Sequence, residues 1–341
     1  MTSQTLRQSI PLVRLSLASP FFDAATASGA NVSKLLATLG LTTSAFSDTE
    51  RLVPAQTIYA VVEALADATD DPHISVKLGT LLDPFSWSPL REAAITSQSI
   101  GEFLLRFSRD AGKDASSATY KMVTEGLRAE FSEVRKTKPA APPRHNDGFS
   151  AAYVLSTLIR AVGDHFDGKQ VIINVTDPDV FPPGYRGVRL ARSGGEGFKI
   201  GFPSEWLLLK TNIDKYGQEI STQGGAAVPV DQMEALKTVI TSNIDDKHLT
   251  TERIAKLCGV STRSLVRQLS QQGSSVKREV DLLRRNRAEF LLANSALGIE
   301  EIGRAVGYTD SSAFVRAFRR WTSVTPGRFR KSGGTKRESL T

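Results

Sequence analysis

Two pairs of arginines near the C-terminus are spaced so that both guanidinium groups of a pair share one face of a helix. Arg263 and Arg267 are four residues apart, and Arg316 and Arg320 repeat that spacing. In a helix such residues stack on one side, and here the apolar residues fall on the other side. A guanidinium group can pair bidentately with O6 and N7 of guanine in the major groove. The spacing is therefore typical of a surface that contacts DNA bases.

The chain contains two copies of one pattern, Ile254–Leu269 and Ile302–Phe318, and each arginine pair lies in a copy or, for Arg320, two residues after it. Each copy starts with a helix-forming segment, breaks at Gly259 or Gly307, and resumes as a second helix. This order predicts two helix-turn-helix units in succession. We expect the inward faces of the second helices to be formed by Leu265, Leu269, Phe314, Phe318 and Trp321.

The segment that joins the copies, residues 274–294, contains strong helix formers and neither Gly nor Pro. It predicts one continuous helix of roughly 30 Å, long enough to place two recognition helices in successive major grooves about 34 Å apart. Contacts to phosphate fix the register of a protein on DNA without reading its sequence. We assign this role to arginines of the joining helix and of the second copy, namely Arg284, Arg285, Arg287, Arg319 and Arg320.

The charge of the chain is concentrated in its C-terminal third. Residues 1–225 hold 23 Lys+Arg and 24 Asp+Glu, whereas residues 226–341 hold 20 and 12, so the net charges are −1 and +8. A helical repeat array is the alternative explanation for a duplicated helix pair, but such arrays need at least three repeats. The basic balance favours a nucleic-acid-binding module instead.

The segment Gly307–Lys331, GYTDSSAFVRAFRRWTSVTPGRFRK, closely resembles the signature of the AraC/XylS transcription regulators, and the preceding residues fit the rest of that module. The resemblance implies an all-α DNA-binding domain of two helix-turn-helix units joined by a long helix. Ser323 departs from the family pattern, which has Gly there, and we expect a slightly altered turn. Carried over by position, the base-reading residues of the family fall on Arg263, Val266, Arg267, Ser311, Ser312 and Arg316.

The composition excludes several other classes of protein. With 341 residues, 40% hydrophobic and 23% charged, the chain suits two or three globular domains. Its single cysteine, Cys258, excludes internal disulfides and thiolate metal clusters, and we expect it to be buried. The four histidines are scattered and favour solvated or capping roles over metal binding. Catalytic motifs are absent, so we predict no enzyme activity, metal or cofactor, and the sequence shows neither a signal peptide nor a membrane span, which favours the cytoplasm.

The order of patterns predicts the domains. Residues 1–222 read as an α+β domain that senses a ligand and dimerises, 223–230 as a linker, 231–331 as the DNA-binding domain, and 332–341 as a disordered tail. Within the first domain we expect helices over about 110 residues, then a β-hairpin at 119–134 with Leu127, Ala129 and Phe131 on one face. A helix at 149–166 and strands in QVIINVT and GFKIGFP follow.

The first domain also carries a resemblance. From about Phe21 to Trp206 it is similar to the arabinose-binding-type N-terminal domain of one AraC subfamily, on the segments FFDAATASGANVSKLLATLGL and RLVPAQTIYAVVEALADATDDPHISVKLG. That domain type serves many effectors, so the resemblance implies a small-molecule effector without naming it.

Clustered arginines and a tryptophan suggest one candidate effector. Guanidinium groups bind phosphate, and indole rings stack on bases. An anionic nucleotide such as cyclic di-GMP would suit the residues Arg7, Arg14, Trp87, Arg91, Arg186, Arg189 and Arg192. Surface arginines are usually solvated and Trp87 would usually be core, so an organic acid, an amino acid or an apolar metabolite stays an alternative, as does the absence of any effector.

These observations predict a one-component regulator that binds promoter DNA as a homodimer under control of an effector. The family resemblance favours activation and contact with RNA polymerase. The alternative is a DNA-binding regulator whose N-terminal domain only dimerises or binds a protein partner, with no small molecule involved.

Overall fold

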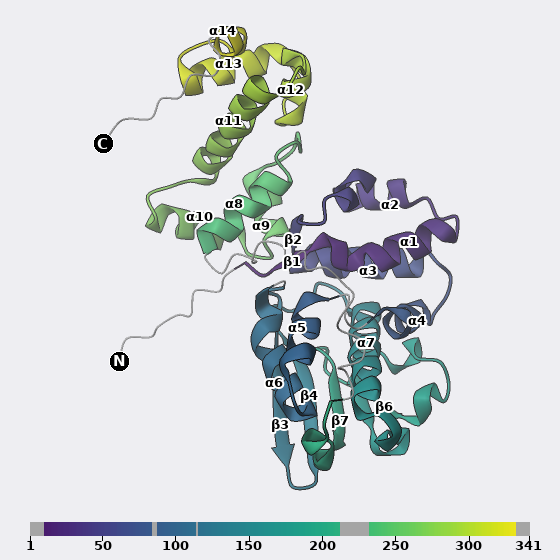
Figure 1. The fold of residues 1–341 in the computed structure, drawn as a ribbon. Helices are drawn as coiled ribbons and strands as arrows, with labels where there is room; N and C mark the ends of the chain where they lie inside the picture. Colours follow the sequence, from purple (N-terminus) through teal and green to yellow (C-terminus); the bar gives the residue numbers. More distant parts are fainter. Residues whose placement is uncertain (1–9, 84–86, 114, 212–231, 332–341) are drawn as a thin grey trace. The chain divides into compact units, whose positions relative to one another are not determined.

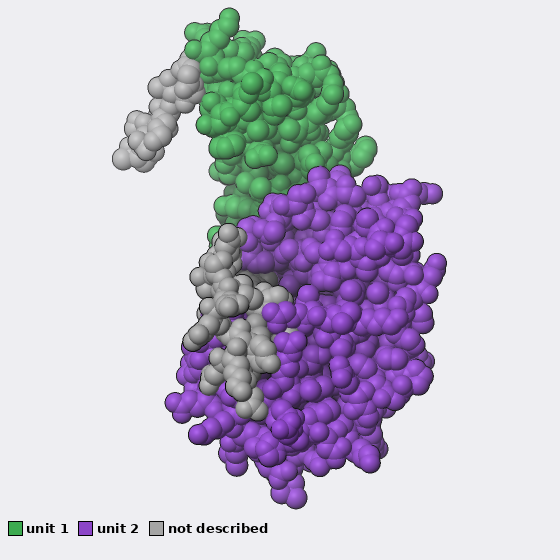
Figure 2. Space-filling model, turned by 45° about the vertical axis from the view of Figure 1, so that its right-hand side comes forward, with its two compact units in different colours: residues 1–10, 231–341 green, residues 11–230 purple. Residues whose placement is uncertain are grey.

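The computed structural model describes residues 10–83, 87–113, 115–211 and 232–331, which fall into two compact units. One unit comprises residues 11–230 and the other residues 1–10 with 231–341 (Figure 2). The first unit is α+β and the second is helical, as predicted (Figure 1). Arg7 and the predicted linker and tail lie outside the described residues.

The first unit opens with a helical layer. Its helices are α1 (Ser19–Ala27), α2 (Val32–Thr38), α3 (Ala55–Asp67) and α4 (Ile74–Leu81), and a short antiparallel pair, β1 (Leu12–Arg14) and β2 (Leu52–Pro54), accompanies them. This pair could not be predicted from the sequence, because strands of three residues are too short to show alternation. Phe21, Leu36 and Leu65 are fully buried in the core of this layer.

A five-stranded sheet forms the second half of the unit, in the order β3-β4-β7-β5-β6. The strands are β3 (Ala118–Glu125), β4 (Arg128–Arg135), β5 (Ile172–Val175), β6 (Arg189–Arg192) and β7 (Lys199–Pro203). β5 and β6 are parallel, and the other pairs are antiparallel. The helices α5 (Ser88–Thr96), α6 (Ile100–Asp110) and α7 (Arg144–Val162) share one hydrophobic core with the sheet.

The β3–β4 hairpin confirms the predicted alternation except at its turn. Ala129 and Phe131 are buried, but Leu127 lies in the turn before β4 and is 87% exposed, so it does not share their buried face as predicted. The turn occupies Gly126 and Leu127, and Gly126 has a φ of 57°, the left-handed conformation that glycine favours. The helix expected from residue 149 begins at Arg144, directly after Pro143 at its N-cap.

The second unit consists of α8 (Gln232–Ser242), α9 (Thr251–Leu257), α10 (Thr262–Gln271), α11 (Val276–Asn294), α12 (Ile299–Ala305), α13 (Ser311–Thr322) and α14 (Pro326–Lys331). α11 runs without a break from the first helix-turn-helix to the second (Figure 1). Phe314 and Phe318 are fully buried, and Trp321 packs against the same core, as the sequence predicted.

Two further predictions concern single residues. Cys258 is buried, as expected, and burial raises the pKa of its thiol to about 12, which keeps the thiol protonated. His145 contradicts the solvated role expected of the histidines, because it is 3% exposed and its ring nitrogens lie 3.2 Å from Ser75 Oγ and Asp67 Oδ1. Burial and the nearby Arg144 lower the pKa of His145.

Candidate nucleic-acid interface and ligand cavity

The N-terminus of each recognition helix is fixed by a side-chain cap. The hydroxyl of Ser261 accepts a hydrogen bond from the amide of Ser264 at 3.1 Å at the start of α10. The carboxylate of Asp310 accepts hydrogen bonds from the amides of Ser312 and Ala313, both at 2.9 Å, at the start of α13. Such caps satisfy the free amides of a first helical turn and stabilise the helix by about 1 kcal/mol.

The face of α10 opposite its core carries three of the predicted base-reading residues. Leu265 and Leu269 are buried, while Arg263, Val266 and Arg267 are exposed. A cationic and partly apolar face of this kind fits the donor, acceptor and methyl pattern of the major groove.

The second recognition helix repeats the arrangement with one difference. Ser312 and Arg316 are exposed, and the Arg316 side chain is 74% exposed, whereas Ser311 is half-buried. Arg316 lies 4.0 Å from the capping Asp310. Arg320 differs, because its guanidinium donates to the carboxylate of Asp281 on α11 at 3.2 Å.

The five predicted phosphate contacts fall into three environments. Arg287 and Arg319 are exposed. Arg285 is half-buried and Arg320 is exposed, and each pairs with an acidic residue on α11. Arg284 is different in kind. Its Nη2 donates to the backbone carbonyl of Asp246 at 3.3 Å, and its guanidinium lies 5.2 Å from the centre of the Tyr308 ring. This position favours a structural role for Arg284 over the phosphate contact that we predicted.

Ser323 ends α13 in the left-handed conformation, with φ of 65° and ψ of 2°. This is the conformation that glycine adopts without strain at a helix C-terminus. The turn therefore keeps the geometry expected of glycine, at a cost in backbone strain to Ser323.

A cavity of about 550 Å³ lies within the first unit, between the helical layer and the sheet. Its walls come from β1 and the turn after it, α1, α3, α7, β3 and β4. Among the described residues, six aromatic side chains line it, namely Phe21, Tyr59, Trp87, Tyr120, Phe149 and Tyr153. Its charged lining residues, among those that the structure describes, are Arg14, Glu50 and Glu133. A cavity of this size and character is typical of a small-molecule site.

Only some of the predicted effector residues lie at this cavity. Arg14 and Trp87 line the cavity, where Arg14 Nη1 donates to Glu50 at 2.5 Å and Trp87 meets Phe107 edge-on at 5.3 Å. Arg91 is buried on α5 but does not line it. Arg186, Arg189 and Arg192 are exposed at and before β6, where Arg192 pairs with Asp177. The structure does not bring these last three to the cavity.

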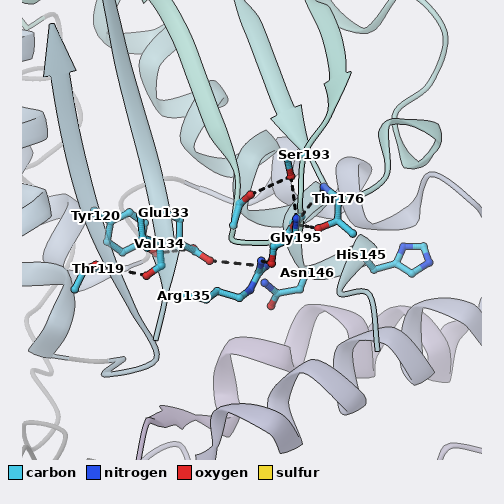
Figure 3. A network of polar contacts seen from close by, with 12 residues as sticks. Thr119, Tyr120, Glu133, Val134, Arg135, His145, Asn146, Thr176, Ser193 and Gly195 are labelled. Carbon is cyan, nitrogen blue, oxygen red and sulfur yellow. Dashed lines mark hydrogen bonds and ion pairs between the residues drawn. The ribbon is translucent and has the colours of Figure 1, made fainter. Parts of the chain in front are cut away.

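Tyr120 and Glu133, which line the cavity, belong to a network of polar side chains (Figure 3). Tyr120 donates to Glu133 Oε2 at 3.1 Å, and Glu133 Oε1 lies 3.9 Å from Arg135 Nη2. The side chain of Arg135 is 2% exposed, forms a salt bridge with the buried side chain of Asp147, and donates to the carbonyl of Gly195 at 3.1 Å. Burial raises the pKa of Tyr59 to about 12 and also raises the pKa of Glu133.

Sequence reasoning missed Tyr59, Tyr120, Glu133 and Arg135. One signal was present: Phe131, Glu133 and Arg135 alternate on one face of β4, and Phe131 faces the core. Charged residues on the core face of a strand cost free energy unless they are paired, so they mark a site that needs explaining.

Two protein-family models match the chain. A model described as a helix-turn-helix domain matches residues 254–332, and one described as the arabinose-binding domain of AraC transcription regulators, N-terminal, matches residues 29–184. None of the helices in the described parts of the chain has the length and apolar composition needed to cross a membrane.

Known relatives and solved structures are similar to parts of this chain that differ in length. The ornithine utilization regulator of Pseudomonas aeruginosa is 25% identical over 284 residues, which cover 77% of this chain and 79% of that protein. The transcriptional regulator VqsM of the same species is 33% identical over 90 residues, which cover 26% of this chain and 28% of VqsM. The crystal structure of the P. aeruginosa regulator CdpR aligns with 93% of this chain and 98% of its own, at 17% identity and a TM-score of 0.40.

Proposed function

This chain belongs to the AraC family of DNA-binding transcription regulators, which are not enzymes, and we propose that a small molecule bound in the cavity of its first unit controls its binding to promoter DNA. The observation that carries the DNA-binding part is the pair of capped helices, α10 and α13, each with a buried apolar side and exposed arginines on the other. The effector part rests on the aromatic cavity and on the match to a ligand-binding family model.

In this proposal Arg263, Val266 and Arg267 read one stretch of bases and Ser311, Ser312 and Arg316 read another. The 19 residues of α11 give a rod of about 28 Å, which suits two recognition helices in successive major grooves. Arg285, Arg287, Arg319 and Arg320 contact phosphates. We also propose that the protein acts in the cytoplasm as a homodimeric activator that contacts RNA polymerase, on the strength of family membership.

Cyclic di-GMP is the candidate effector that the arginine spacing suggested, but the cavity gives it little support. Among the described residues, its lining holds two carboxylates, Glu50 and Glu133, and one arginine, Arg14, which pairs with Glu50. A ligand with two phosphates would meet unfavourable charge there. The name of the ornithine utilization regulator points to an amino acid for that protein, and an amine-bearing metabolite is the class that we favour for this one.

The proposal is tested in two steps with the full-length chain. Selection from random DNA followed by gel-shift titration should yield a defined operator, and Arg267→Ala or Arg316→Ala should weaken the operator complex far more than the complex with random DNA. Equal losses on both would contradict base reading.

The second step tests the cavity. Ser150 lines it from α7, so Ser150→Phe should fill part of it, whereas Ser33→Phe adds the same ring on the exposed surface of α2. A screen of amino acids, amines, organic acids and cyclic di-GMP should find a ligand that raises the unfolding temperature of the wild type and the Ser33→Phe variant only. If every stabilising ligand acted equally on all three proteins, the alternative of a first unit that only dimerises or binds a protein would be favoured.

A further inference from the structure

Glu133 is a buried carboxylate in the wall of the cavity with few partners of its own. It is 7% exposed, and among the described residues its side chain accepts one hydrogen bond, from the hydroxyl of Tyr120 to Oε2. A carboxylate offers about four acceptor positions, and a buried one is normally well satisfied. Oε1 therefore has capacity for a donor in the cavity that it lines.

The nearby arginine does not supply that donor. The Nη2 atom of Arg135 lies 3.9 Å from Glu133 Oε1, too far for a hydrogen bond, and the same guanidinium forms its close salt bridge with Asp147. Asp147 also accepts hydrogen bonds from the amide and the hydroxyl of Thr176. One guanidinium thus faces two buried carboxylates, and ionisation of both leaves a negative charge without a counter-ion. Burial is the main cause that raises the pKa of Glu133.

The aromatic walls favour the same kind of ligand. Tyr59 and Tyr120 flank the polar wall, and the guanidinium of Arg135 already lies over the Tyr59 ring, 5.3 Å from its centre. Phe149 and Tyr153 stack in parallel at 6.1 Å between ring centres on α7. The faces of such rings carry negative charge density and attract cations within about 6 Å of the ring centre. Aromatic rings beside a carboxylate that shares its single counter-ion with a second carboxylate are the recognition chemistry of an organic ammonium or guanidinium group.

We propose, on the premise that the cavity holds the effector, that Glu133 is the counter-ion for a positively charged nitrogen group carried on a largely apolar body. The cation supplies the hydrogen-bond donors that Oε1 lacks and the charge that balances the cluster of Glu133, Arg135 and Asp147. The apolar body packs against the aromatic walls. The ligand class is therefore an amine or a guanidine, and neutral or anionic compounds of the same shape bind less well.

Three compounds with the same phenylethyl body test the charge: phenethylammonium, phenethyl alcohol and hydrocinnamate. Calorimetric titration into the full-length wild-type chain should rank phenethylammonium above the other two by at least tenfold in Kd. Glu133→Gln keeps the shape and the bond from Tyr120 but removes the charge, so it should abolish the preference for the ammonium compound while leaving the alcohol unchanged. Glu133→Asp keeps the charge and should keep the preference.

Glu130→Gln is the matched control. Glu130 lies on the same strand, faces the other side of the sheet, and is 3.6 Å from Lys199, so the same change of charge should leave all three affinities unchanged. The wild-type ranking is decisive even if a variant fails to fold: hydrocinnamate or the alcohol binding as tightly as the ammonium compound overturns the proposal. If such binding is lost in Ser150→Phe, the cavity still holds the effector and only its charge class is wrong. If binding persists unchanged in Ser150→Phe, the effector site itself is misplaced.

Discussion

Replacing Arg284 should destabilise the second unit but leave the salt dependence of DNA binding unchanged, because Arg284 does not contact a phosphate in our interpretation. Two interactions fix its guanidinium: the hydrogen bond to the Asp246 carbonyl at 3.3 Å and the position over the Tyr308 ring at 5.2 Å. A hydrogen bond from a charged donor contributes about 1.5 kcal/mol or more, and a partly exposed cation–π contact about 0.5–1 kcal/mol. We therefore expect Arg284→Ala to lower the free energy of unfolding of this unit by about 2 kcal/mol.

Hydrogen exchange of the full-length chain measures this effect locally, because it reports the opening of each segment separately. Amides of α11, α12 and α13 should exchange faster in Arg284→Ala by a factor that corresponds to about 2 kcal/mol, and those of the first unit should not change. Gel shifts at several salt concentrations supply the second readout. The slope of log K against log salt is negative, and each lost phosphate contact reduces its magnitude by about 0.9.

Arg287→Ala is the matched control, because Arg287 is exposed on the same helix. It should lower the salt slope by about one and leave exchange unchanged, whereas Arg284→Ala should do the reverse. Unchanged exchange in Arg284→Ala together with a lower salt slope would refute the structural role and restore the phosphate contact.

Three further predictions follow from single residues. Arg316→Ala should cost about 1–3 kcal/mol on the operator and relax base preference at one position, as measured by binding to singly substituted operators. Ser323→Gly should raise the stability of the second unit by about 1 kcal/mol in urea unfolding, because glycine adopts the left-handed conformation without strain; a loss of stability would argue against that conformation. Burial raises the pKa of Glu63 in the folded chain to about 7, above its ordinary value of 4.5, so its protonated form stabilises the fold below pH 4.5 and this stabilisation is lost as the pH rises through 7. The free energy of unfolding of Glu63→Gln, relative to that of the wild type, should therefore rise by about 3 kcal/mol between pH 4.5 and 8. A difference between the two proteins that does not vary with pH would show that Glu63 does not titrate in this range.

The two units differed in how much of them could be predicted from the sequence. The helix-turn-helix pattern is local: each buried stripe, each glycine turn and each exposed arginine falls within a few residues of the next. Periodicity is therefore enough to place Leu265 against the core and Arg267 away from it. The cavity is not local, because Tyr59 on α3 and Glu133 on β4 meet only when the two layers pack.

Two positions show where a local pattern is not enough to place a side chain. Leu127 alternates with Ala129 and Phe131 in the sequence, but it lies in the two-residue turn before β4 and is exposed. Arg284 looks like Arg285 and Arg287 in the sequence. Its partners, Asp246 and Tyr308, lie 38 and 24 positions away, so only the fold distinguishes it.

Arginine illustrates why residue type alone does not assign a role in this protein. Arg135 is buried and its charge is offset by Asp147, so it organises the wall of the cavity. Arg284 is partly buried and donates to a backbone carbonyl, which adds no opposing charge but joins two segments of the second unit. Arg316 has only a distant contact with Asp310 and keeps 74% of its side chain exposed. An exposed guanidinium such as those of Arg267 on α10 and Arg316 on α13 can bind a base edge or a phosphate, whereas the arginine that lines the cavity is buried and paired with Glu50. The arginines therefore assign DNA to the second unit, while the surplus carboxylate Glu133 assigns a cation to the first.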